Sequence, residues 1–173
     1  MLIIFTGNGK GKTTAALGQA LRAVGAGKRV LMVQFIKGPW HSGEDVSAKR
    51  LSPQFKLVKK GKGFVGIGGD RLPRKVHAAA ALAGMAYAEK QALTKKWDML
   101  ILDEIWNAHH LKLISAAEIW NCIQKALPCV DHLIMTGRDC PQRFIRMADL
   151  VTEMKEIKHP FNKKQPGTKG LEF

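Results

Sequence analysis

The feature that most constrains the fold of this chain is a glycine-rich segment that begins at its sixth residue. The segment reads Thr6-Gly7-Asn8-Gly9-Lys10-Gly11-Lys12-Thr13-Thr14. It follows a short apolar run over residues 2–5, and alanine and leucine recur at helical spacing over residues 12–24. A glycine-rich loop between a strand and a helix is the setting of a phosphate-binding loop. A plain strand-to-helix turn with an incidental Lys-Thr pair is the alternative, but these flanks favour the phosphate loop.

Each residue type in this segment has a role in binding a polyphosphate. Glycines let the backbone curl so that several N–H groups face one phosphate, and the start of the helix adds its positive dipole end. Lys12 is expected to contact a phosphate as a point charge, and the Thr13 hydroxyl is expected to ligate Mg²⁺. We therefore expect the nucleotide to be bound by the whole segment, namely Gly7, Asn8, Gly9, Lys10, Gly11, Lys12, Thr13 and Thr14.

The glycine spacing departs by one residue from the general pattern G-x-x-x-x-G-K-[ST]. Counting back from Gly11 and Lys12, the first glycine position holds Thr6, and the glycine follows it at Gly7. A second lysine, Lys10, also lies inside the loop. We expect the nucleotide to sit differently from that of an ordinary ATPase.

Strands and helices alternate along the rest of the chain, which predicts one α/β domain over residues 1–173 with a mainly parallel open sheet flanked by helices. Ser115 and Glu118 form the pattern of a capping box at the start of one helix. Two segments, 36–53 and 61–73, are predicted to be loops, and the second is rich in glycine. The predicted strands are 2–5, 30–35, 55–58, 99–102, 132–135 and 150–154, and the predicted helices are 12–24, 74–95, 115–127 and 141–147.

Polar residues follow two of the predicted strands. Asp103 and Glu104 come directly after the strand at 99–102, and the carboxyl ends of such strands are where open α/β sheets bind ligands. One or both carboxylates are expected to meet Mg²⁺, although an N-cap for a helix over 105–113 is the alternative. Arg138, which follows the strand at 132–135, is a candidate phosphate contact or a surface arginine.

The chain is strongly basic, with 28 Lys and Arg against 14 Asp and Glu and a net charge of +14. Such charge is typical of proteins that meet nucleic acid, an anionic membrane surface, a polyphosphate or an acidic protein. No RNP aromatics, zinc finger or basic zipper accompanies it, so nucleic acid is disfavoured. The segment 49–62 holds several lysines and no acidic residue, and a solvated basic face is its simplest interpretation.

Other sequence features exclude several classes of protein. No apolar run reaches the roughly 18–20 residues of a membrane span, and no basic leader precedes the first apolar run. The three cysteines are odd in number and lack a CxxC spacing, which argues against a disulfide framework or a zinc site. We expect a reduced domain in the cytoplasm.

Several blocks of the sequence, in this order, resemble one family. The chain is similar from end to end to the P-loop type of ATP:corrinoid adenosyltransferase, the enzyme that adenosylates cob(I)alamin or its precursors. The resemblance is carried by Gly7-Asn8-Gly9-Lys10-Gly11-Lys12-Thr13-Thr14-Ala15-Ala16, Val33-Gln34-Phe35-Ile36-Lys37-Gly38, Leu102-Asp103-Glu104, Thr136-Gly137-Arg138, Lys158-His159-Pro160-Phe161 and Lys169-Gly170-Leu171-Glu172-Phe173.

The resemblance implies a homodimeric enzyme with a RecA-like parallel sheet. Such an enzyme transfers the 5′-deoxyadenosyl group of MgATP to the cobalt of a Co(I) corrinoid and releases triphosphate, in adenosylcobalamin biosynthesis or salvage. Its members bind ATP in the reverse sense to most P-loop proteins. Cobalt(I) is itself the nucleophile, so Lys10, Lys12 and the Mg²⁺ held by Thr13 and Glu104 are expected to stabilise charge on the departing triphosphate.

The same resemblance assigns the corrinoid to the loop over residues 61–73. Aromatic residues of many members contact the lower corrin face from this stretch, and here Phe64 is expected to do so, whereas Gly66 stands where a tryptophan is usual. The loop is expected to be mobile without ligand and to order over the corrinoid.

The cobalt must also be reduced, which implies a reduced flavin or a small acidic flavoprotein as electron donor. A donor of this kind is expected to dock on the acid-free segment 49–62, where charge reversal at Lys56, Lys59 and Lys60 is expected to slow the reaction.

Two other functions remain possible on the sequence alone. A P-loop ATPase or kinase acts at the γ-phosphate and releases phosphate or transfers it, and a nucleic-acid-binding ATPase binds its polymer with a steep salt dependence. The phosphate species released from ATP separates these functions from adenosyl transfer.

Overall fold

The structure of the chain is a computed structural model that describes residues 1–160 and 165–171. Three residues of the blocks that carry the family resemblance, Phe161, Glu172 and Phe173, lie outside the described residues. The same is true of Lys163 and Lys164, two lysines near the end of the chain. Within the described part, no helix is both long enough and apolar enough to cross a membrane.

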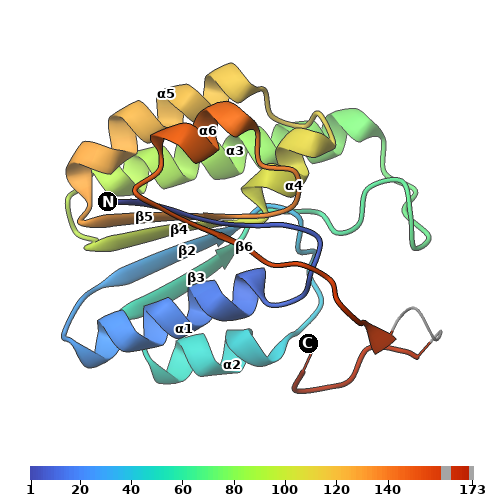
Figure 1. Cartoon of the computed structure of the whole chain (residues 1–173), viewed down its shortest axis with the longest axis horizontal. Coiled ribbons are helices and arrows are strands. Elements are labelled where there is room, and N and C mark those ends of the chain that lie inside the picture. The colour runs from blue at the N-terminus through green and yellow to red at the C-terminus, as the bar shows by residue number, and fades with distance from the viewer. Residues whose placement is uncertain (161–164, 172–173) are drawn as a thin grey trace.

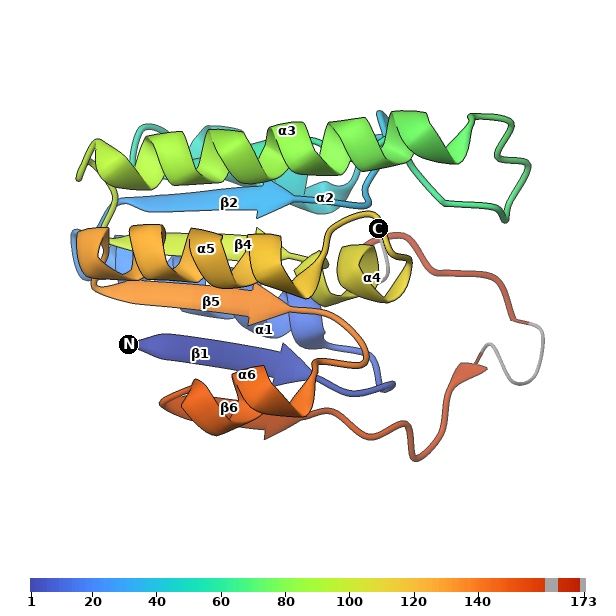
Figure 2. The same ribbon diagram turned by 90° about the horizontal axis from the view of Figure 1, so that it is seen from above.

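A single parallel sheet forms the centre of the molecule (Figures 1 and 2). The strand order is β3-β2-β4-β5-β1-β6, and every neighbouring pair is parallel. All strands therefore end at the same edge, which is the edge that carries the glycine-rich loop in Figure 2. The strands are β1 (Leu2–Thr6), β2 (Val30–Gln34), β3 (Phe55–Lys59), β4 (Met99–Asp103), β5 (His132–Thr136) and β6 (Leu150–Glu153).

Helices cover both faces of the sheet (Figure 1). Two lie on one face, α1 (Lys12–Gly25) and α2 (Gly43–Arg50). The other face is covered by α3 (Arg74–Leu93), α4 (Ile105–His110), α5 (Ala116–Ala126) and α6 (Gln142–Met147), and the 3₁₀ turn η1 (Leu127–Cys129) follows α5. The α/β fold with a mainly parallel sheet is thus confirmed.

The predicted strands and helices are all present, each within two residues of its expected ends. The capping box at α5 is confirmed, because the Ser115 N–H donates to Glu118 Oε2 at 2.7 Å and the Glu118 N–H donates to Ser115 Oγ at 3.2 Å. The prediction of a loop over 36–53 was wrong, because α2 occupies its second half. This helix is short and buries only Ala48, so no apolar periodicity marks it.

The sheet is buried on both sides, which explains why its central strands are almost continuously apolar. Every residue of β1, β2 and β4 is buried. On the side of α3, α5 and α6, the Trp106 and Phe144 rings pack with centroids 4.9 Å apart and are fully buried. On the side of α1, the smaller residues Ala16 and Ala20 bring the helix close to the sheet. Both layers fix the positions of the strand ends.

The first glycines of the loop lie directly against the chain that follows β6. The Gly9 N–H donates to the Met154 carbonyl at 2.7 Å, and the Met154 N–H donates to the Thr6 carbonyl at 2.8 Å. Gly7 has φ +97, and a Cβ there would overlap the Met154 carbonyl oxygen. A glycine is therefore required at position 7 by backbone packing, which gives a physical reason for the displaced glycine of the motif.

We predict opposite stability effects for two Gly→Ala substitutions. Gly7→Ala should lower the free energy of unfolding by at least about 1–3 kcal/mol, since it adds both backbone strain and overlap. Gly18→Ala should raise it by about 0.5–1 kcal/mol, because Gly18 lies inside α1 with nothing near its Cβ position. Urea denaturation measures both, and a Gly7→Ala variant as stable as the wild type would contradict this account of the loop.

Candidate functional site

The loop between β1 and α1 folds around its own lysine. Gly11 has φ +113 and leads into α1, whose first residue is Lys12. Lys12 Nζ donates to the carbonyls of Gly7 and Gly9, at 2.7 and 2.6 Å. The ammonium group therefore lies inside the curve of the loop, bonded to these two carbonyl groups. Burial lowers the pKa of Lys12, and the nearby charge of Arg138 lowers it further.

A buried carboxylate connects this loop to the neighbouring strands. Asp103, the last residue of β4, is fully buried and receives three side-chain hydrogen bonds. Its Oδ1 accepts from the hydroxyls of Thr13 at 3.0 Å and Thr136 at 2.6 Å, and its Oδ2 accepts from Gln34 Nε2 at 3.0 Å. The pKa of Asp103 is raised because the charge is buried, although each of these donors favours the ionised form.

Glu104 adopts a backbone conformation that is uncommon for a residue with a side chain. Its φ is +62 and its ψ is 24, and its N–H donates to Thr136 Oγ1 at 2.9 Å. It precedes α4, but its side chain makes no capping hydrogen bond. The structure thus gives no support to the capping alternative. Left-handed non-glycine residues are held by their surroundings and gather at functional sites.

The carboxyl group of Glu104 is poised to titrate near neutrality. Burial, and then the adjacent charge of Asp103, raises its pKa to about 7. Three cations oppose this rise, in the order Lys37, Lys12 and Arg138. A pair of carboxylates facing three cations next to a phosphate-type loop is suited to hold a divalent cation and a polyanion together.

Lys37 was not singled out from the sequence, although it lies in one of the blocks that carry the family resemblance. It follows β2, just as Glu104 follows β4, and its Nζ lies 2.6 Å from Glu44 Oε1. Its place directly after a parallel strand was the available signal. The sequence also could not show that Glu44, on the unpredicted α2, would hold it.

The remaining predicted loop residues lie at the surface. Asn8 and Thr14 are exposed, and the exposed Lys10 donates from Nζ to the Leu171 carbonyl at 2.8 Å. Arg138 is also exposed, and its N–H donates to Asn107 Oδ1 at 2.9 Å, which fixes its backbone beside the site. The structure therefore brings together Lys12, Thr13, Asp103, Glu104 and Arg138.

Phe64 belongs to a second part of this edge. It lies in the loop between β3 and α3, and its ring is 5.7 Å from that of Trp40 between centroids. Both side chains are more than half exposed, 54% for Phe64 and 59% for Trp40. The Trp40 ring packs against Gly38 and Gly63, where a Cβ would lie within 3.0 Å of it. Trp40 is thus an exposed aromatic residue that the sequence analysis missed.

Gln34 connects the two parts of the site. Its side chain donates to Asp103, while its backbone carbonyl accepts the N–H groups of Lys60 and Gly61, at 2.9 and 3.2 Å. Its Oε1 is buried and has no hydrogen-bond partner among the described residues. One residue at the end of β2 therefore fixes both the carboxylate and the start of the Phe64 loop.

Some lysine side chains of the basic segment 49–62 contact other parts of the protein. Lys59 is 15% exposed and pairs with Asp45 at 2.6 Å, and Lys60 Nζ lies 4.5 Å from the centre of the Tyr87 ring. These two lysines are therefore engaged within the fold and are not available as the sequence suggested. Lys49 and Lys56 line an open groove of about 670 Å³ between α2 and β3.

The comparisons with known proteins agree on one family. The family model described as ATP:corrinoid adenosyltransferase BtuR/CobO/CobP matches residues 1–173. The corrinoid adenosyltransferase CobA of Salmonella typhimurium and the corrinoid adenosyltransferase of Escherichia coli K12 are each 34% identical over 173 residues, which is 100% of this chain and 85% of each relative.

A corrinoid adenosyltransferase of Pseudomonas aeruginosa is 34% identical over 175 residues, with 83% of that protein covered. Among solved structures, the flagellar accessory protein FlaH of Methanocaldococcus jannaschii matches with a TM-score of 0.55. The match covers 88% of this chain and 69% of that one at 11% identity, so it supports the fold alone.

The raised pKa of Glu104 predicts a stability that depends on pH. Because the folded state holds a proton that the unfolded state releases between about pH 4.5 and 7, the stability contributed by Glu104 is present below pH 4.5 and lost as the pH rises through 7. Glu104→Gln should remove this loss and become more stable than the wild type at pH 8. Urea denaturation at pH 5 and pH 8 measures the free energy of unfolding of both proteins. If it changed equally with pH in the wild type and in Glu104→Gln, the raised pKa assigned to Glu104 would be contradicted.

Proposed function

The chain belongs to the ATP:corrinoid adenosyltransferase family BtuR/CobO/CobP, and from this membership we propose how its site works. It is an enzyme that adenosylates corrinoids in cobalamin biosynthesis, with ATP and a corrinoid as substrates. In the proposed reaction, the cobalt of a Co(I) corrinoid attacks C5′ of ATP. A cobalt–carbon bond forms, the bond from C5′ to the triphosphate oxygen breaks, and triphosphate leaves with the electron pair.

The observation that carries the proposal is the contact between the glycine loop and Asp103. The Thr13 hydroxyl lies 3.0 Å from Asp103 Oδ1, directly after Lys12 at the start of α1. A cation, loop N–H groups and hard oxygen atoms are the groups with which P-loop proteins bind a polyphosphate and its counterion, and this likeness supports the same role here.

The residues present fit a magnesium ion. Thr13, Asp103 and Glu104 supply oxygen donors, and burial together with the adjacent charge of Asp103 raises the pKa of Glu104 to about 7, an unfavourable charge that a divalent cation would relieve. We propose that these three residues hold Mg²⁺ directly or through water. When bound, Mg²⁺ would neutralise charge on the departing triphosphate.

The protein's own contribution is orientation and charge stabilisation. Cobalt(I) is already a strong nucleophile, so no protein base or nucleophile is required. Lys12 is proposed to bind the triphosphate as negative charge develops on it, together with the exposed side chains of Lys10 and Arg138. The N–H groups of the loop from Gly7 to Thr14, except that of Gly9, which donates to the Met154 carbonyl, and the start of α1 are proposed to fix its position, so that C5′ faces the corrinoid.

The corrinoid is proposed to lie against Phe64 at the same edge of the sheet. Phe64 and Trp40 together present an exposed aromatic surface, and such flat apolar surface suits a macrocycle. Gly66 has φ +71, which disfavours any larger residue there, so Trp40 supplies the second aromatic ring from a different segment.

The reaction itself tests the proposal. The protein is incubated with MgATP and chemically reduced cobalamin, while the cobalt–carbon chromophore and the phosphate species are followed by absorbance and ³¹P NMR. We expect one triphosphate for each adenosylated corrinoid. Release of phosphate and ADP without the chromophore would instead identify a γ-phosphate enzyme.

Lys12→Ala should lower the rate of this reaction by about 10²–10³, the usual effect of losing one charge-stabilising contact. Since Lys12 also bonds to the loop carbonyls, the free energy of unfolding is measured in parallel to show that the fold persists. A wild-type rate in a folded Lys12→Ala protein would contradict the assignment of this lysine.

A homodimer in the cytoplasm is the proposed state of the enzyme. The edge strand β6 supports an interface, because all four of its residues are exposed and include Leu150 and Val151. The cytoplasm is proposed because it supplies ATP. Sedimentation equilibrium measures the oligomeric state.

A reduced acidic flavoprotein is the proposed electron donor. The net charge of +14 would attract it over about a Debye length, roughly 8 Å at physiological salt, and would act mainly on the association rate. The groove lined by Lys49, Lys56 and Lys59 is the candidate docking surface; Lys59 is paired with Asp45, so Lys49 and Lys56 are the lysines proposed to meet the partner.

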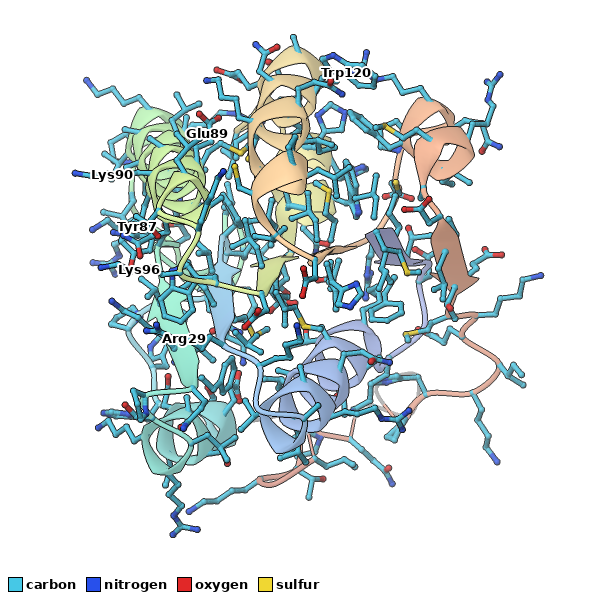
Figure 3. All side chains as sticks on the ribbon, turned by 90° about the vertical axis from the view of Figure 1, so that its left-hand side faces the viewer. Arg29, Tyr87, Glu89, Lys90, Lys96 and Trp120 are labelled. Atoms are coloured by element: carbon cyan, nitrogen blue, oxygen red, sulfur yellow. The ribbon has the colours of Figure 1, made fainter. Side chains whose placement is uncertain are left out.

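Charge reversal tests this surface. The double variant Lys49→Glu and Lys56→Glu should slow the flavoprotein-driven reaction and flatten its salt dependence, with no effect when a chemical reductant is used. The matched control reverses Lys90, in the last turn of α3, and Lys96, which follows α3 (Figure 3); both are exposed and neither lines this groove. If charge reversal at Lys90 and Lys96 slows the flavoprotein-driven reaction as much as reversal at Lys49 and Lys56, the effect comes from the net charge of the protein and not from a docking surface.

A further inference from the structure

A buried carboxylate closes the loop that carries Phe64. Asp70 lies in this loop, and its Oδ2 accepts the Gly66 N–H at 2.9 Å while its Oδ1 accepts the Leu72 N–H at 3.0 Å. The same Oδ2 lies 3.0 Å from Nε2 of His77, in the first turn of α3. The Asp70 side chain is only 8% exposed and that of His77 only 2%.

The direction of the histidine contact follows from the chemistry of the carboxylate. The N–H groups of Gly66 and Leu72, and then His77, lower the pKa of Asp70, so its side chain is ionised at neutral pH. An ionised carboxylate can only accept hydrogen bonds, so His77 Nε2 carries the hydrogen and donates it. Asp70 thus joins two points of the loop to the start of a long helix.

This loop needs such a connection. Gly63, Gly66, Gly68 and Gly69 all have positive φ, and glycine loses more backbone freedom on ordering than any other residue. The hydrogen bonds of Asp70 span the segment that contains two of these glycines, Gly68 and Gly69. The Phe64 ring packs over Gly68, where a Cβ would lie 3.2 Å from Phe64 Cδ2. The position of Phe64 therefore depends on a backbone that Asp70 holds.

We propose that Asp70 and His77 are positioning residues that hold the corrinoid loop in its binding shape before the corrinoid arrives. The inference rests on the proposed function, in which this loop receives the corrinoid. It differs from the expectation in the sequence analysis that this loop is mobile without ligand and orders over the corrinoid. With the loop preformed, the ordering entropy is not lost again when the substrate binds.

The test combines hydrogen exchange with substrate kinetics on the full chain. Asp70→Asn keeps the size of the side chain but removes its charge and one acceptor, and His77→Leu removes the donor from the buried pair. In either variant, amides over residues 64–72 should exchange faster without ligand. The KM for chemically reduced cobalamin should rise by about tenfold or more, as expected for loss of a hydrogen bond to a charged group. The KM for ATP should stay within about twofold, because no loop residue of the nucleotide site is touched.

Two further variants provide controls. His77→Gln retains an N–H donor and should restore part of the corrinoid KM. Asp131→Asn removes an exposed carboxylate that pairs with Lys28 at the opposite edge, and should change neither measurement.

Several outcomes would overturn the inference. Unchanged exchange over residues 64–72 in both variants would show that the pair does not hold the loop. Faster exchange with an unchanged corrinoid KM would show that the held shape is not the binding shape, and an equal rise in the KM for ATP would indicate general damage. A wild-type protein without adenosyl transfer would refute the proposed function instead, while the exchange measurement would still report on the pair.

Discussion

The carboxylate of Asp103 is the constraint on which the active edge depends. Burying a charge is unfavourable unless neighbouring groups satisfy it, and here three donors from three segments do so: Thr13 after the glycine loop, Gln34 at the end of β2 and Thr136 at the end of β5. The same Thr136 hydroxyl accepts the N–H of Glu104, which holds that residue in its left-handed conformation. One side chain therefore connects the start of α1 to the ends of β2 and β5, in addition to the backbone hydrogen bonds that hold the loop against Met154.

The two proposed substrate regions share this framework. The proposed nucleotide region is built on β1 and β4, and the aromatic surface of Phe64 and Trp40, where the corrinoid is proposed to lie, is built on the segments that follow β2 and β3. Gln34 serves both, with its amide on Asp103 and its carbonyl on the start of the Phe64 loop. A reaction that needs cobalt in line with C5′ requires the two regions to keep a fixed separation, and a shared strand end provides it.

Local patterns in the sequence predicted most of the fold, and they indicated the residues that the structure brings together in the proposed nucleotide region. The glycine loop, the Asp103-Glu104 pair and the strand periodicities depend on neighbours in the chain, so the sequence reports them. The features it could not report depend on contacts across loops. These are the stacking of Trp40 on Phe64, the pairing of Lys59 with Asp45, and the bonds of Asp70 to Gly66 and His77. The helix α2 was missed for a different reason, since a short helix that buries one alanine lacks the apolar period of an amphipathic helix.

We propose that the buried carboxyl group of Asp103 serves to bind MgATP and not to stabilise the fold. Urea unfolding of Asp103→Asn, with and without MgATP, tests it most directly. The amide oxygen of the asparagine can still accept hydrogen bonds from the hydroxyls of Thr13 and Thr136. If the Gln34 amide turns by half a rotation, its oxygen can accept a hydrogen bond from the amide nitrogen of the asparagine. We therefore predict a variant at least as stable as the wild type without ligand, which MgATP no longer stabilises. A variant that is less stable without ligand, yet stabilised by MgATP as much as the wild type, would contradict the account.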